Sequence, residues 1–297
     1  MITAYVALAA AALFWSGNML TGRALHAAVP PLGLAFWRWV LILLVLAPFV
    51  ATPLRRAWPQ IRAHWPMLML LGLLSTGLFN ALVFLALHHT SATNAALLNS
   101  SIPVWTALLG VTFTRLRPAP VELAGLAVSL AGVLAIISRG EPARLATLQI
   151  NAGDALMLIG MVAWSVYALL LPRRPKALGP FSYLWITGAL GLPAVLAAAA
   201  LQAWSAPQPD LLAPPRSAEA WAGIVYLALF PSILATAAYN HAIDRVGPLR
   251  AGQAVHLVPV FTALIAWASL GEAIEPFHVL GFALILGGLA LSGRHRG

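Results

Sequence analysis

The sequence contains no cysteine and is poor in charged residues. Only 8% of its 297 residues are Asp, Glu, Lys or Arg, whereas 61% are hydrophobic, and the mean hydropathy is +0.88. So few charges cannot cover a soluble domain of this length with a polar surface. The lack of cysteine excludes disulfides, thiolate metal sites and cysteine nucleophiles. The composition therefore predicts an integral membrane protein.

Acidic residues are scarce, and none lies in the middle of an apolar run. The sequence has eight Asp and Glu, all in loops or in the first turns of a run. Glu122 and Asp154, for example, stand where a helix N-terminus favours negative charge. The sequence thus offers no sodium site and no carboxylate proton relay within the membrane. P-loop, zinc-protease and nucleophile-elbow motifs are also missing, so we expect no enzyme activity, no cofactor and no metal.

Ten apolar runs, each near the ~20 residues that a helix needs to cross a bilayer, follow one another along the chain. They cover residues 4–22, 32–52, 66–86, 91–114, 119–138, 152–171, 180–202, 219–241, 249–270 and 276–293. The basic residues lie mostly in the short gaps between runs, which is typical of membrane topology rather than of nucleic-acid binding.

The positive charges also predict the orientation. Of the 17 Lys and Arg, twelve fall in alternate gaps and at the C-terminus, four fall in the opposite set of gaps, and Arg38 lies inside the second run. By the positive-inside rule, both termini are cytoplasmic.

The sequence repeats itself at an offset of 156 residues. Residues 95–110 read AALLNSSIPVWTALLG, and residues 251–266 read AGQAVHLVPVFTALIA. The match continues in the next run, where Gly125 and Gly132 return as Gly281 and Gly288. Earlier in each half the offset is 149, and a longer loop at 203–218 explains the difference. We interpret this pattern as a duplication, with five helices at 1–140 and five at 151–293.

Five is an odd number, so the two halves must have opposite orientations in the membrane. The charges of equivalent loops agree with this inversion. Inverted repeats are the architecture of alternating-access carriers, whose substrate site lies between the halves near the midplane. The predicted fold is an all-α membrane protein with ten transmembrane helices in two inverted five-helix repeats.

This layout resembles the EamA-type branch of the drug/metabolite transporter superfamily over essentially the whole chain. The resemblance rests on Pro-Val-x-Thr-Ala-Leu in the fourth and ninth runs, Trp-Ser in the first and sixth, and Leu270-Gly271-Glu272. Within the family, the aromatic amino-acid exporters of the bacterial inner membrane look most similar. Leu-Gly-Glu has no counterpart in the first half, where the sequence reads Arg115-Leu116-Arg117. Because the motif is not repeated, Glu272 is interpreted as a charge at a helix end and not as a functional residue.

Polar and aromatic residues within the apolar runs are the candidate site, because each is costly unless it faces protein or water. The resemblance places the first, third, fourth, sixth, eighth and ninth runs around a central cavity, and those runs hold the candidates. We predict a substrate cavity lined by Trp15, Asn18, Asn80, Asn99, Ser100, Trp164, Tyr167, Tyr239, Gln253 and His256.

Two prolines and two ionisable residues have alternatives that the sequence leaves open. Pro103 and Pro259 have no N–H, so each leaves the carbonyl one turn earlier without its helical hydrogen bond. The two prolines serve either as hinges or as bends that help the helices pack. His256 shares a helix face with Gln253 and is either a cavity residue or a packed core residue. Arg38 lies six residues into its run, where snorkelling to the interface is favoured over anion binding.

The sequence thus predicts a multi-pass secondary transporter of the bacterial inner membrane that moves small neutral metabolites, most of all aromatic amino acids. We expect a small-molecule substrate, contact with lipid, no nucleic-acid partner and a monomer. The alternatives are export of other metabolites or drugs, or an intramembrane enzyme or lipid-handling protein. His256 has no neighbouring acid to keep it charged, so we expect facilitated downhill movement rather than proton coupling.

Overall fold

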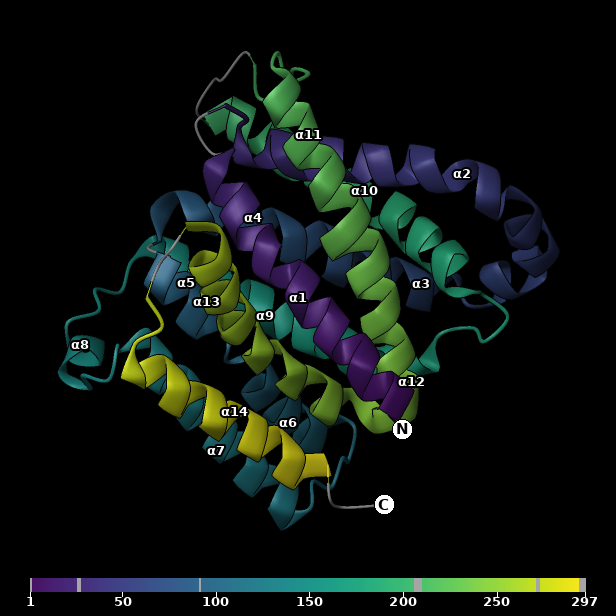
Figure 1. Ribbon diagram of the computed structural model, residues 1–297. Coiled ribbons are helices and arrows are strands. Elements are labelled where there is room, and N and C mark those ends of the chain that lie inside the picture. The colour runs from purple at the N-terminus through teal and green to yellow at the C-terminus, as the bar shows by residue number, and fades with distance from the viewer. Residues whose placement is uncertain (1, 26–27, 91, 206–209, 271–272, 294–297) are drawn as a thin grey trace.

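The computed structural model describes residues 2–25, 28–90, 92–205, 210–270 and 273–293. These residues form helices and connecting loops, with no strand among them (Figure 1). Gly271 and Glu272, which take part in the predicted Leu-Gly-Glu motif, lie outside the described residues.

The helices of the first half are α1 (Ile2–Ala24), α2 (Pro31–Ala63), α3 (Trp65–Gly72), η1 (Leu73–Phe79), α4 (Asn80–His89), α5 (Ala92–Asn99), α6 (Ile102–Phe113) and α7 (Pro120–Ile137). The short α8 (Ala143–Ala146) follows in the connection. The helices of the second half are α9 (Ala152–Leu170), η2 (Leu171–Arg173), α10 (Pro180–Ser205), α11 (Ala218–Leu227), η3 (Ala228–Leu234), α12 (Ala235–Gln253), η4 (Ala254–His256), α13 (Leu257–Leu270) and α14 (Pro276–Gly293).

Nine helical stretches among the described residues are long and apolar enough to cross a membrane. One of them, Ala218–Ala268, has 51 residues, more than twice the ~20 that one crossing requires. Gly247, with φ 81° and ψ 165°, breaks the helix between the predicted eighth and ninth runs. The all-helical membrane fold is confirmed, while ten crossings and cytoplasmic termini stay predictions.

Equivalent helices of the two halves begin in the same way. Pro31 and Pro180 open α2 and α10, and Pro120 and Pro276 open α7 and α14. Proline suits the first position of a helix because the missing N–H would have no partner there. At the start of α9, Asn151 and Asp154 cap each other, which confirms that Asp154 is a helix-start residue.

α7 and α14 pack along each other through small residues (Figure 1). A Cβ atom at Gly288 would lie 2.5 Å from the carbonyl oxygen of Gly125, and one at Gly132 would lie 2.7 Å from that of Gly281. The helices are therefore antiparallel. Because Gly281 and Gly288 are the repeat mates of Gly125 and Gly132, each half offers the other the same contact, as across a two-fold axis.

At two other places, a residue touches its own repeat mate directly. The ring of His256 lies 3.0 Å from the carbonyl oxygen of its mate Ser100. The indole rings of Trp15 and Trp164 meet edge to face with centroids 5.9 Å apart. A residue can contact its own mate only near a symmetry axis, so these pairs mark where the two halves face each other.

Large apolar side chains cover much of the outer surface. Phe49, Phe113 and Trp204 are 71%, 77% and 84% exposed. Such exposure is costly in water but not in a bilayer, whose hydrocarbon solvates apolar side chains. The polar candidates therefore have to be sought inside the bundle.

Candidate functional site

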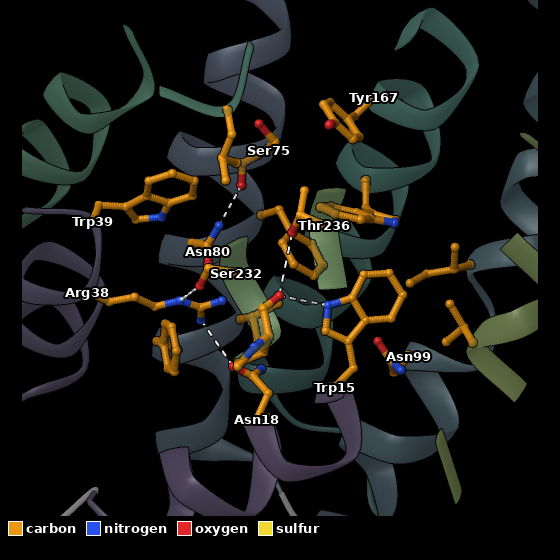
Figure 2. A pocket seen from close by; sticks show the side chains of 18 of the residues that line it. Trp15, Asn18, Arg38, Trp39, Ser75, Asn80, Asn99, Tyr167, Ser232 and Thr236 are labelled. Carbon is orange, nitrogen blue, oxygen red and sulfur yellow. Dashed lines mark hydrogen bonds between the residues drawn. The ribbon is translucent and has the colours of Figure 1, made fainter. Parts of the chain in front are cut away.

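A cavity of about 900 Å³, including the space at its mouth, lies between the two halves (Figure 2). Its wall combines aromatic rings with a few polar groups, contributed by Trp15, Asn18, Arg38, Trp39, Ser75, Phe79, Asn80, Val83, Phe84, Asn99, Ile102, Trp164, Tyr167, Leu184, Thr187, Pro231, Ser232, Thr236, Val255 and Val258.

Two π-helical segments, η1 and η3, form part of this wall. Segments of this type are rare, and they are frequent at functional sites. Two polar side chains donate hydrogen bonds to backbone carbonyl oxygens five residues earlier. Asn80 Nδ2 donates to the carbonyl oxygen of Ser75 at 2.8 Å, and Ser232 Oγ donates to that of Leu227 at 2.5 Å. The carbonyl oxygen of Pro231 accepts from Trp15 Nε1 at 3.0 Å. The widened turns thus place polar groups at the cavity while their backbone remains satisfied.

Arg38 of α2 extends into the same space with a buried guanidinium group (Figure 2). Its Nε donates to Ser232 Oγ at 2.5 Å, and its Nη1 donates to Asn18 Oδ1 at 3.1 Å. The ring of Phe84 lies 5.8 Å from the guanidinium carbon. Arg38 therefore links α1 and α2 of the first half to η3 of the second.

Trp164 is the centre of the aromatic part of the wall. Its ring lies 4.6 Å from that of Phe79, 5.0 Å from that of Tyr167 and 5.7 Å from that of Tyr239, measured between centroids. The Tyr167 hydroxyl donates to Asn240 Oδ1 at 3.0 Å. Packing and hydrogen bonds fix these rings, so they form a firm apolar surface.

The EamA-like transporter family matches the chain twice, at residues 2–138 and 151–294. The chain belongs to the EamA-like transporter family. It is similar to the uncharacterized transporter YyaM of Bacillus subtilis, with 31% identity over 79% of this chain and 75% of the relative. It is also similar to a probable terminal-alkyne amino-acid exporter of Streptantibioticus cattleyicolor, with 28% identity over 88% and 84% of the two chains.

Two further comparisons concern location and fold. The uncharacterized inner membrane transporter YedA of Escherichia coli K12 is 26% identical over 96% of this chain and 89% of the relative. A solved crystal structure superposes on this chain with a TM-score of 0.71 at 20% sequence identity. The match covers 98% of this chain and 96% of the chain in that structure, and it supports the fold alone. The family is one of multi-span membrane transporters, so a transporter rather than an enzyme is indicated.

The structure brings six of the ten predicted cavity residues of this EamA-like transporter to the cavity wall. They are Trp15, Asn18, Asn80, Asn99, Trp164 and Tyr167. Tyr239 lies behind the wall, fully buried against Trp15 and Trp164. Ser100, Gln253 and His256 are absent from the lining, because their polar groups bond elsewhere within the protein.

His256 and Gln253 face α7 instead of the cavity. In the neutral imidazole, the Nε2–H group donates to the Ser100 carbonyl oxygen at 3.0 Å, and Nδ1 lies within hydrogen-bond distance of the Ser129 hydroxyl oxygen, at 2.8 Å. Gln253 Nε2 donates to the Glu122 carbonyl at 3.2 Å. The Ser100 hydroxyl donates to the carbonyl oxygen of Ala96 in the last turn of α5. We call this contact region of α7 with α14 and η4 the glycine-histidine seam, defined by Gly125, Ser129, Gly132, His256, Gly281 and Gly288.

Both predicted hinge prolines follow a break in their helix. α5 ends at Asn99, and α6 begins at Ile102, just before Pro103. In the second half, the 3-10 turn at Ala254–His256 separates α12 from α13, which contains Pro259. The two breaks are repeat mates, and movement about them stays a prediction.

Several cavity residues were not predicted as such. Arg38 was expected to snorkel, yet it bonds inward. Trp39, Thr187 and Ser232 also line the cavity. One signal was available in the sequence, because Arg38 lies deeper inside an apolar run than any other Lys or Arg.

Proposed function

We propose that this protein is a secondary transporter, acting as an exporter or facilitator, that moves aromatic amino acids and similar small metabolites across the bacterial inner membrane by alternating access. The observation that carries the proposal is the cavity between the halves, with its aromatic wall around Trp164 and its amides at Asn18, Asn80 and Asn99. An apolar pocket with few polar groups suits a substrate with one ring and one polar end.

The comparisons support parts of this proposal. One relative is named a probable amino-acid exporter, and another is named an inner membrane transporter. The contacts between repeat mates support the two-fold relation that alternating access uses. The paired helix breaks before Pro103 and Pro259 are suitable points for the halves to rock about.

The cavity also supports downhill movement rather than proton coupling. Among the described residues, no Asp or Glu contributes to its wall, and His256 lies behind it with both ring nitrogens bonded to protein. A coupling group has to exchange protons with both sides in turn. We therefore propose that the substrate follows its own concentration gradient.

Counterflow in sodium-free proteoliposomes tests the function. Vesicles loaded with unlabelled phenylalanine should accumulate labelled phenylalanine transiently, and labelled glucose should not accumulate. Empty vesicles provide the background. The absence of counterflow with phenylalanine, tyrosine and tryptophan would reject the proposal. Steady accumulation that requires a pH gradient and collapses on addition of a protonophore would reject the downhill part alone.

Reporter fusions at residues 56 and 210 test the orientation on which alternating access depends. We expect residue 56 to be cytoplasmic and residue 210 to lie outside. Both residues on one side would contradict the inverted arrangement.

A further inference from the structure

Arg38 is a buried cation without an acidic partner. It is 6% exposed, and no carboxylate in the described part of the chain lies within ion-pair distance of it. Its two hydrogen-bond partners, Asn18 and Ser232, are both neutral. A buried charge with neutral partners is costly, and within a membrane it marks a functional site by default.

The guanidinium group keeps donors to spare on the cavity side. Arginine has five N–H donors, and the bonds to Ser232 and Asn18 use two of them. The remaining N–H groups have no acceptor among the described residues. Unused donors next to a fixed positive charge provide what an oxyanion needs.

The packing around Arg38 holds the group in one orientation. Hydrogen bonds to Asn18 and Ser232 hold two of its nitrogens, and its central carbon lies over the ring of Phe84. A planar fork that is fixed in this way recognises a carboxylate with little further loss of side-chain freedom. An arginine that served only to cross-link helices would not need to border the cavity.

The rest of the cavity wall determines what accompanies the carboxylate. The aromatic rings around Trp164 suit a ring or a branched apolar group. Arg38 is the one formally charged side chain among the described residues of the wall, so an ammonium group would find no carboxylate there, only neutral polar groups and aromatic rings. The amino group of an amino acid is therefore not essential for binding.

We propose that Arg38 binds the carboxylate of the substrate, and that the cavity takes aromatic carboxylates with or without an α-amino group. This inference rests on the proposed function for its physiological meaning, but it makes a binding claim that is independent of transport. It predicts that 3-phenylpropanoate binds as well as phenylalanine. It also predicts that phenethylamine and the neutral amide 3-phenylpropanamide bind poorly.

Ligand-induced thermal stabilisation of the purified full-length chain in detergent tests the claim. We expect phenylalanine and 3-phenylpropanoate to raise the melting temperature of the wild type. Phenethylamine and 3-phenylpropanamide should require about 10- to 100-fold higher concentrations for the same shift, the effect of losing a charge-assisted hydrogen bond. This comparison needs no variant, so it remains decisive even if a substitution prevents folding.

Two substitutions assign the effect to Arg38. In Arg38→Gln the preference for the acid over the amide should disappear, and in Arg38→Lys it should weaken, since lysine keeps the charge but not the fork. Arg56→Gln, on the exposed part of the same helix, is the matched control and should bind like the wild type. Equal binding of acid and amide by the wild type would overturn the inference, as would an unchanged preference in Arg38→Gln.

The outcomes separate the inference from the proposed function. Counterflow of phenylalanine that is insensitive to Arg38→Gln would keep the function and remove the carboxylate site. Arg38-dependent binding without any counterflow would keep the site and remove the function. A wild type that no aromatic carboxylate stabilises at millimolar concentration would also overturn the inference.

Discussion

The glycine-histidine seam and the cavity are both buried, and each contains an ionisable side chain, but they satisfy these groups differently. In the seam, both ring nitrogens of His256 have protein partners, Ser129 and Ser100. In the cavity, Arg38 has two neutral partners and keeps several donors unused. The seam is a closed hydrogen-bond network, whereas the cavity is an open one.

This difference shows that burial and polarity alone do not identify a site. A fully satisfied polar network rigidifies the structure around it, while a partly satisfied one leaves capacity for a ligand. By this criterion His256 belongs to the framework of the protein, and Arg38 belongs to its binding surface. The expected effects of substitutions on stability follow from this contrast.

The largest effect is expected in the seam, for Gly288→Leu. A Cβ atom at this position would lie 2.5 Å from the carbonyl oxygen of Gly125 and 2.6 Å from the backbone nitrogen of Ser129. Because backbone atoms cannot move aside cheaply, α7 and α14 would have to separate. We expect little or no folded protein, measured as the monodisperse peak in size-exclusion chromatography.

The neighbouring residue provides the control. A Cβ atom at Gly287 would meet nothing within 4 Å, so Gly287→Leu should fold normally. Equal yields of folded protein for the two variants would show that the seam does not need close helix contact.

A smaller loss of stability is expected for His256→Ala. The substitution leaves the Ser100 carbonyl without the imidazole N–H and also creates a cavity, which together cost about 2–5 kcal/mol. The melting temperature in detergent should fall clearly, while counterflow per folded molecule is retained. His64→Ala, at an exposed histidine, should change neither quantity. Normal stability combined with lost transport would instead make His256 a cavity residue.

Arg38→Met should have the opposite profile. The substitution removes a buried charge that has no acidic partner among the described residues, so stability should change by no more than about 1 kcal/mol. Counterflow should nevertheless be lost. Melting temperature and counterflow measured on the same preparation check this pair of expectations. A large fall in melting temperature would assign Arg38 to the framework, together with His256.

The sequence predicted the helical membrane fold from its apolar runs. It predicted much of the cavity because polar and aromatic residues stand out within those runs. Trp15, Asn18 and Trp164 stand out in this way, and they do line the cavity. The direction in which a helix face points is not visible in the same pattern. Gln253 and His256 share a face, as expected, but that face is turned toward α7.

The remaining errors arise from local backbone geometry and from contacts between distant segments. The π-helical turns of η1 and η3 have no sequence rule, although they determine where Ser75 and Ser232 point. Arg38 lies close enough to its helix start to snorkel, and only the position of Ser232 on a distant helix shows that it bonds inward. Such contacts depend on tertiary packing and cannot be read from one segment.

The smallest effect is expected outside both regions, at the ion pair between Glu141 and Arg144 in the connection between the halves. The hydrogen bond and the positive charge of Arg144 lower the pKa of Glu141 in the folded protein. A lowered pKa stabilises the folded state above the unfolded pKa of about 4.3, and this contribution is lost as the pH falls through the folded value. Both side chains are about half exposed, so solvent screens the pair strongly. Glu141→Gln should therefore lower the melting temperature slightly at neutral pH, and the difference from the wild type should shrink as the pH falls below about 4.3 and vanish once the pH is below the lowered pKa of Glu141. A difference at neutral pH as large as that of His256→Ala would show that this surface connection, and not only the seam, holds the halves together.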